Sequence, residues 1–299
     1  MSNETLIILG NGFDLDLGLN TSFRDFVRSF LFQTAPEVPL IKKIKIEEWS
    51  DLERELRDAI LEYAESPTVS LLEDITYTWL VIQQRWARYI SEITELKEIN
   101  IKRDSYAYQL MQKTTDTSNW YSFNYTDPFY LCNISEQMQP TYLHGSFTPR
   151  EYTQKSNLMF LIPKNLIIGI DSNVPLSIMN NKRIRHIIKI KHPEYKTTEL
   201  SQSLKSSRNI ILFGHSLAIT DSDYFKEFFY SIINGELRKK RIFIITYDSC
   251  SLEKIKENMK EYSIDYYQLL RSDVEVIPIF TKSNTGYNDF KYILNLVSP

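Results

Sequence analysis

Two residues combine a reactive side chain with a position at the end of an expected strand. His144 follows the run 141–143 and precedes Gly145. Its imidazole titrates near neutral pH, so it could act as a general base or hold a ribose hydroxyl. Asn124 follows the aromatic run 120–123 and could orient a water or a ribose. The structural alternatives are a histidine bonded in the core and an amide that completes a turn.

A glycine turn follows the first apolar run of the chain. Residues 6–9 are apolar, and Gly10-Asn11-Gly12-Phe13-Asp14 comes next. Glycines let a ligand approach the backbone, and the amides after them could point at an anion. A tight turn without a ligand is the alternative, because the third glycine of the dinucleotide fingerprint is missing. The nearby Asp14 and Asp16 would suit ribose hydroxyls or a metal-bound phosphate better than a bare phosphate.

A second glycine turn, Gly214-His215-Ser216, follows the apolar run 209–213. Ser216 does not complete the nucleophile-elbow pattern Gly-x-Ser-x-Gly, since Ala218 stands at the last position. We therefore favour backbone amides holding a phosphate over serine hydrolysis. His215 either bonds across the site or is structural. Asp221 either contributes to the site or caps the helix after it.

The composition indicates a globular protein and excludes several classes. The chain has 299 residues, of which 24% are charged, as is usual for globular proteins. Its net charge of −3 gives no strong indication of nucleic-acid binding, which usually requires a basic domain. The basic runs 182–191 and 238–241 could touch phosphates, but we interpret them as solvated faces or as the lead-in to a strand. The two cysteines, Cys132 and Cys250, have no paired spacing for a zinc site or a disulfide framework. No targeting or membrane-spanning segment is evident, so we expect a cytoplasmic protein and no membrane partner.

The elements that must position these residues alternate between strands and helices. Ser22 or Thr21 is expected to cap the first amphipathic helix, with Asp25 near its third position. Thr126 and Asp127 are expected to cap the helix that follows them, with Pro128 at its first position. Further strands are expected at 120–123, 141–144, 166–171, 209–213, 242–247 and 274–279, and helices at 174–192, 224–234 and 251–270. This order predicts an open, mostly parallel, Rossmann-like α/β sheet, in which ligands bind beyond the carboxyl ends of the strands. We expect residues 1–34 and 118–299 to form this domain and 35–117 to form a helical insertion lobe.

The order of these motifs resembles the bacteriophage abortive-infection AbiH family over nearly the whole chain. The blocks that carry the resemblance are Gly10–Asp14, Trp49-x-x-Leu52-Glu53, Phe123–Thr126, His144-Gly145, Ile168-Gly169 and Gly214–Leu217 with Asp221 and Tyr224. The resemblance implies a bacterial antiphage role, in which an infected cell stops growing before phage can mature.

The same order also resembles, more distantly, the sirtuin-like NAD-binding domains of antiphage effectors. That resemblance implies a sirtuin-like fold, catalysis by Asn124 and His144, and NAD as substrate or ligand. It implies a cofactor site made of Gly10, Asn11, Gly12, Phe13, Asp14, Thr126, Gly214, His215, Ser216 and Asp221. Many sirtuins carry aspartate where Thr126 stands, and zinc-binding cysteines are absent. Cleavage of the N-glycosidic bond of NAD is therefore implied rather than protein deacylation.

Two other functions stay open from the sequence. A metal held by Asp14, Asp16 and Glu53 would make the protein a metal-dependent nuclease or nucleotide-processing toxin, although we assign no metal. A non-catalytic nucleotide sensor could instead recruit a protein partner through its helical lobe. A phage-encoded trigger and a homo-oligomer are the further partners that we consider.

Overall fold

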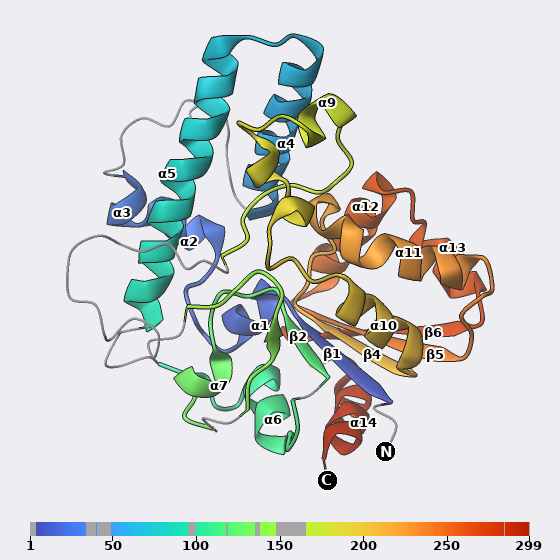
Figure 1. Cartoon of the computed structure of the whole chain (residues 1–299). Coiled ribbons are helices and arrows are strands. Elements are labelled where there is room, and N and C mark those ends of the chain that lie inside the picture. Colours follow the sequence, from blue (N-terminus) through green and yellow to red (C-terminus); the bar gives the residue numbers. More distant parts are fainter. Residues whose placement is uncertain are drawn as a thin grey trace. The chain divides into compact units, whose positions relative to one another are not determined.

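The computed structural model describes residues 4–33, 40, 49–94, 100–117, 119–134, 138–147, 166–283 and 285–298 (Figure 1). The chain divides into two compact units. The first holds Met1–Leu19, Lys97–Leu143 and Lys196–Pro299, and the second holds Asn20–Leu96 and His144–Tyr195. The domain boundaries expected at 34, 35 and 118 lie outside the described residues. Among those that are described, no helix is both long and apolar enough to cross a membrane.

Six parallel strands form one open sheet in the first unit, in the order β3-β2-β1-β4-β5-β6 (Figure 1). They are β1 (Thr5–Leu9), β2 (Trp120–Ser122), β3 (Thr141–Tyr142), β4 (Asn209–Phe213), β5 (Lys240–Thr246) and β6 (Val274–Phe280). β1 is central: Ile7 is in register with Trp120 of β2 and Ile211 of β4. The prediction of an open parallel α/β sheet is confirmed.

The strand order of the sheet reverses beside β1. β2 and β3 extend it on one side of β1, whereas β4, β5 and β6 extend it on the other. The loops that follow β1 and β4 are therefore neighbours at the carboxyl edge of the sheet. In doubly wound sheets this reversal point is where ligands bind.

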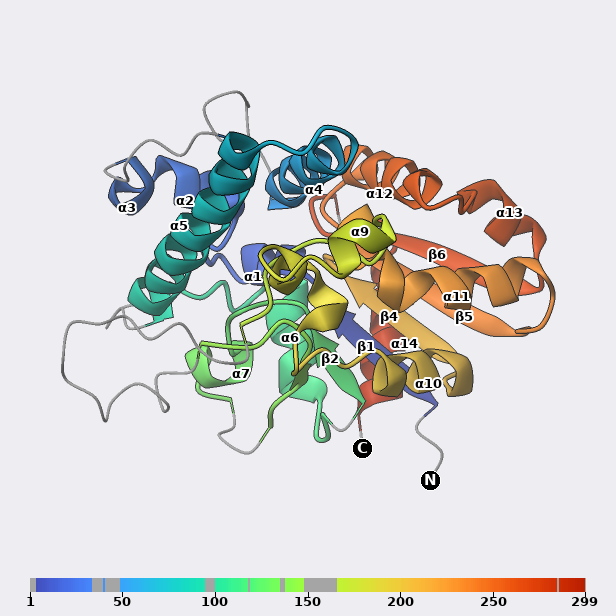
Figure 2. The ribbon, with the colours of Figure 1, turned by 45° about the horizontal axis from the view of Figure 1, so that its top comes forward.

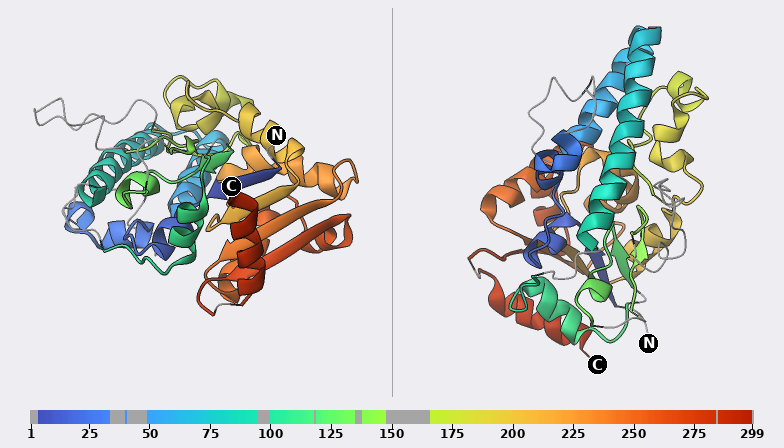
Figure 3. Two further views of the ribbon diagram at one scale, coloured as in Figure 1. Left: turned by 90° about the horizontal axis from the view of Figure 1, so that it is seen from below. Right: turned by 90° about the vertical axis from the view of Figure 1, so that its left-hand side faces the viewer.

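Helices cover both faces of this sheet. The helices of the first unit are α1 (Asn11–Asp16), α6 (Tyr106–Lys113), α7 (Pro128–Leu131), α10 (Thr198–Ser206), the 3-10 helix η4 (Ile219–Asp221), α11 (Ser222–Ile233), α12 (Ser249–Glu261), α13 (Tyr266–Arg271) and α14 (Tyr287–Val297). Figure 2 shows α10 and α11 in front of the sheet and α14 behind it, and the left view in Figure 3 shows the same separation. Strands buried on both faces explain the continuous apolar runs of β1 and β4.

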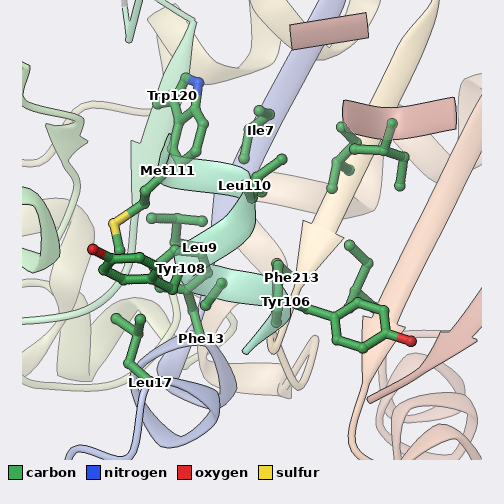
Figure 4. Close-up of a cluster of buried hydrophobic side chains, with 14 of the residues drawn as sticks. Ile7, Leu9, Phe13, Leu17, Tyr106, Tyr108, Leu110, Met111, Trp120 and Phe213 are labelled. Carbon is green, nitrogen blue, oxygen red and sulfur yellow. The ribbon is translucent and has the colours of Figure 1, made fainter. Parts of the chain in front are cut away.

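One core cluster fixes the start of the chain against β4. Ile7 and Leu9 of β1 pack with Phe213 of β4 and Phe13 of α1, beneath the side chains of α6 (Figure 4). The rings of Phe13 and Phe213 meet edge to face, with centroids 4.9 Å apart. Each buried side chain of this kind contributes about 1.5–3 kcal/mol, so the turn between β1 and α1 is firmly anchored.

The second unit is helical. It contains α2 (Phe23–Arg28), α3 (Phe30–Gln33), α4 (Trp49–Glu65), α5 (Val69–Thr94), α9 (Leu176–Met179) and the 3-10 helices η2 (Arg185–Ile187) and η3 (Lys189–Lys191). Ser22 caps α2 in a capping box with Asp25, which confirms the predicted start of that helix. Leu56, Ile60 and Ile75 of α4 and α5 share a core cluster with Ile187 and Ile188.

The strand expected at 166–171 is absent from the sheet, so that prediction is wrong. The segment lies in the second unit, where Ile170 makes only an isolated bridge to Ile188. Trp79 of α5 donates its indole N–H to the carbonyl of Ile168, at 2.9 Å. The apolar run is therefore buried against helices instead of neighbouring strands. A sequence period cannot separate these two environments.

Two of the expected helices are also shorter than predicted. The stretch 174–192 holds only α9, η2 and η3, and the stretch 251–270 is divided into α12 and α13. The helix expected at 224–234 is confirmed as α11.

Candidate functional site

The glycine turns after β1 and β4 interlock. The Gly10 amide donates to the Phe213 carbonyl at 2.9 Å, and the Gly12 amide donates to the Gly214 carbonyl at 3.0 Å. A Cβ on Gly12 would lie 2.6 Å from the Gly214 Cα, and Gly214 itself has a φ of 65°. The Phe13 amide also donates within the turn, to Gly10. These glycines allow two backbones to touch, and their amides bond to main-chain carbonyls of the chain itself.

Asp14 is the centre of a buried hydrogen-bonded cluster. Its carboxylate accepts from Asn124 Nδ2 at 2.9 Å and from Thr126 Oγ1 at 2.5 Å. All three residues are buried, Asp14 and Thr126 to 1% exposure. Burial, and next the charge of Asp14, raises the pKa of the Cys132 thiol to about 12. The cluster joins α1 to the loop after β2 at the carboxyl edge of the sheet.

The same contacts set the orientation of the Asn124 amide. A carboxylate oxygen can only accept a hydrogen bond, so the Nδ2 side of the amide must face Asp14. Oδ1 of Asn124 is therefore the atom directed away from that carboxylate. Thr126 donates its hydroxyl to Asp14. Asp127 caps α7 by accepting from the Tyr130 amide at 3.1 Å, and Pro128 is at the first helical position, as predicted.

His215 is held in one tautomer by its own loop. Its Nδ1 accepts from the Leu217 amide at 3.0 Å, so the proton of the neutral ring is on Nε2. Nε2 lies 3.8 Å from Asp221 Oδ2. The ring packs edge to face on Phe123 with centroids 4.3 Å apart. Asp221 stands at the start of α11 but makes no side-chain cap, and its carboxylate lies beside the imidazole instead.

The two predicted catalytic residues belong to different units. Asn124 lies in the first unit and His144 in the second, where the His144 carbonyl accepts from the Ile167 amide at 3.0 Å. Their joint action on one substrate stays a prediction. Of the other predicted site residues, Asn11 is exposed on the first turn of α1, and Ser216 is half-buried with its carbonyl accepting from Asn258 Nδ2.

The three carboxylates of the metal hypothesis are engaged in different places. Asp14 bonds to Asn124 and Thr126, and Asp16 Oδ2 accepts from the Ala107 amide at 2.8 Å. Glu53 lies in the second unit and pairs with Lys189. Within the described ranges, no group of three or more His, Cys, Asp or Glu side chains is arranged to hold a metal ion.

Sequence reasoning missed two charged residues that pair with buried carboxylates in the second unit. Lys189 Nζ lies 3.1 Å from Glu53 Oε1, with both side chains almost fully buried. Arg57, one turn further along α4, places Nε 2.9 Å from the buried Asp171 carboxylate. Lys189 stands among exposed basic residues, and the only available signal was the four-residue spacing of Glu53 and Arg57. The interpretation of 182–191 as entirely solvated is therefore wrong for Lys189.

The first unit is thus an open, all-parallel α/β protein with polar loops gathered beyond the carboxyl ends of its central strands. The chain belongs to the bacteriophage abortive infection AbiH family, whose model matches residues 6–245, and it is by this membership an antiphage abortive-infection protein. The resemblance to that family is confirmed. No curated protein and no solved structure matches the chain. The resemblance to sirtuin-like domains stays a prediction.

Proposed function

We propose that this antiphage protein binds NAD or a related dinucleotide beyond β1 and β4 and hydrolyses its N-glycosidic bond. The observation that carries the proposal is the strand order, which reverses between these two strands. Sheets with this order bind dinucleotides at the reversal point. The segments 10–14 and 214–216 meet there through the Gly12–Gly214 hydrogen bond.

The Asp14 cluster supports a role for Asn124 in this reaction. With Nδ2 bonded to Asp14, Oδ1 would accept a hydrogen bond from the attacking water or from the ribose of the nicotinamide nucleoside. His144 would take the proton that this water loses as its oxygen bonds to the ribose C1′. The C1′–nitrogen bond breaks in that step, and nicotinamide leaves with the bonding electron pair. Loss of NAD would then halt the infected cell.

The dinucleotide would be held by side chains and outward-facing groups rather than by the glycine amides. Gly10, Gly12 and Phe13 use their amides within the chain, so these residues would contribute close approach. Asn11, Ser216 and the His215–Asp221 pair would supply polar contacts to ribose and phosphate oxygens. A cytoplasmic location, a phage-encoded trigger and a homo-oligomer accompany this proposal as predictions.

Turnover of NAD by the full-length protein tests the proposal. Purified protein is incubated with NAD, with ATP or with RNA, with and without magnesium, and also with an extract of phage-infected cells that would supply a trigger. Products are separated by chromatography. We expect nicotinamide release that Asn124→Ala and His144→Ala each lower at least about a hundredfold.

Two substitutions outside the proposed site serve as controls. Asn234→Ala and His192→Ala remove an exposed amide and a half-buried imidazole, and they should leave the turnover unchanged. Nicotinamide release that persists in the Asn124 and His144 variants would rule out the mechanism. Cleavage of RNA or ATP with intact NAD, abolished by a chelator, would favour a metal-dependent toxin.

A further inference from the structure

Residues 176–193, here called the basic segment, carry a concentrated positive charge in a protein whose net charge is −3. The segment contains Lys182, Arg183, Arg185, Lys189 and Lys191 and has no aspartate or glutamate. Four of these five cations are exposed, and Lys189 is the buried exception. The negative net charge of the chain therefore conceals a local excess of positive charge in the second unit.

The exposed cations have no carboxylate to neutralise them among the residues that the structure describes. No salt bridge joins Lys182, Arg183, Arg185 or Lys191 to a described acidic residue, whereas Lys189 is paired with Glu53. Their charges face solvent. Counterions that accumulate around such a group are released when a polyanion binds.

In the second basic run of the chain, residues 238–241, the cations bond to groups of the protein itself. Lys240 Nζ donates to the carbonyls of Lys205 and Ser207 at the end of α10. Arg241 pairs with Glu275, and Arg238 Nε donates to the Gly235 carbonyl. That run is used by the fold, but the side chains of Lys182, Arg183 and Arg185 have no comparable contacts within the described residues.

The backbone of the basic segment is fixed from beneath. Ile184, Ile187 and Ile188 are fully buried in the core of the second unit. The amides of Ile170 and Lys189 donate to the carbonyls of Ile187 and Ile170, both at 2.9 Å. A rigid base lowers the entropy lost when a ligand orders the cations above it.

We propose that the basic segment binds the phosphodiester backbone of a nucleic acid. Arg183 and Arg185 supply planar guanidinium groups that match phosphate oxygens in pairs. His186 is exposed beside them, and its ring packs edge to face with that of Trp79, with centroids 4.6 Å apart. An anionic membrane fits less well, because interfacial segments insert a continuous apolar face. Ile178, Ile184, Ile187 and Ile188 of this segment are buried in the core, and its exposed large apolar side chains are the separated Leu176 and Ile190. The proposal does not depend on NAD binding or turnover.

Binding of the full-length protein to labelled single strands of about 20 nucleotides tests this proposal, at salt between about 50 and 200 mM. RNA and DNA of the same sequence are compared, and the tighter binder identifies which of the two nucleic acids supplies the phosphodiester backbone. The double substitution Arg183→Gln with Arg185→Gln should weaken binding about tenfold. It should also reduce the slope of log affinity against log salt by about 1.4, or about 0.7 for each lost cation.

The matched control removes two exposed arginines from the first unit, with the substitutions Arg208→Gln and Arg271→Gln. It makes the same change in net charge and should alter binding less than about twofold. Equal losses in the two double variants, no binding of wild type at low salt, or binding only to anionic vesicles would each overturn the proposal. Unchanged thermal unfolding of both variants establishes that a loss of binding is not a loss of folding.

Discussion

At the scale of single residues, Asp14 is the most constrained group of the proposed site. Its buried carboxylate accepts hydrogen bonds from two side chains that lie 110 and 112 residues away in the sequence. A buried charge of this kind is stable only while its donors remain. The Asp14 carboxylate thus bonds to donors of the protein itself, and its bond to Nδ2 fixes the orientation of the Asn124 amide.

Replacing Asn124 by aspartate should place two carboxylates against each other in a buried site. We expect Asn124→Asp to lower the unfolding free energy by about 3 kcal/mol at pH 7. Like charges raise the pKa of the pair in the folded state, so the loss should grow as the pH rises and shrink towards pH 5. Urea unfolding at the two pH values measures both effects.

Asn124→Ala is the control for this prediction. It removes the donor but adds no charge, so its cost should vary less between pH 5 and pH 7. An Asn124→Asp cost that is independent of pH would contradict close contact between residues 14 and 124.

At the scale of elements, ion pairs with buried carboxylates connect α4 to the chain that follows residue 166. Glu53 pairs with Lys189, and the Gly169 amide lies 3.4 Å from Glu53 Oε1. Arg57 pairs with Asp171 in the same unit. These pairs explain why an apolar segment that resembles a strand is buried against helices.

Removing one partner of the Glu53–Lys189 pair should be costly because the other charge stays buried. We expect Glu53→Leu and Lys189→Met each to lower the unfolding free energy by about 3–5 kcal/mol. The double variant Glu53→Leu with Lys189→Met should lose less than either single variant. A double-mutant cycle by chemical denaturation measures the coupling. Additive losses would show that the two groups do not interact.

Asp16 connects α1 to α6 and predicts a pH dependence. Burial raises the pKa of its carboxyl above the ordinary value of 3.8, and the bond from the Ala107 amide opposes that effect. Between the unfolded and the raised folded pKa, the folded state binds more protons, so its stability falls as the pH rises. The variant Asp16→Asn lacks this titration.

The unfolding free energy of Asp16→Asn, relative to wild type, should therefore increase as the pH rises from about 3.8 and then level off above the folded pKa. Urea unfolding at several pH values gives this difference. Asp273→Asn, at an exposed position, is the matched control. A difference that stays constant or decreases with pH would contradict the raised pKa.

At the scale of the whole molecule, ligand binding should stabilise the native state. A nucleotide bound to folded protein at about 100 times its dissociation constant adds about 2.7 kcal/mol to the unfolding free energy. We expect NAD to raise the melting temperature by several degrees, measured by calorimetry beside AMP and nicotinamide. Stabilisation without turnover, even in infected-cell extract, would identify a nucleotide sensor. No shift at millimolar NAD would count against the proposed site.

Local signals allowed much of the fold to be predicted from the sequence. The apolar runs of β1 and β4, the capping box at Ser22 and the Asp127-Pro128 start of α7 were all predicted. Each depends on residues within a few positions, where backbone sterics and local hydrogen bonds decide the structure. The parallel α/β class and the AbiH family follow from the order of such segments along the chain.

Only the tertiary structure decided the features that depend on contacts between residues far apart in the sequence. The run 166–171 has the apolar pattern of a strand, yet it lies outside the sheet because the core cluster and buried ion pairs of the second unit hold it. Lys189 reads as a surface cation and is buried because Glu53 neutralises it. The role of Asp14 in ligand binding stays a prediction, and the structure adds that its carboxylate accepts a hydrogen bond from Asn124. The sequence alone determined the six strands of the sheet and the polar residues at their carboxyl ends. Hydrogen bonds and ion pairs between distant residues determined which of these ends meet, since their free energy depends on distances that no local pattern encodes.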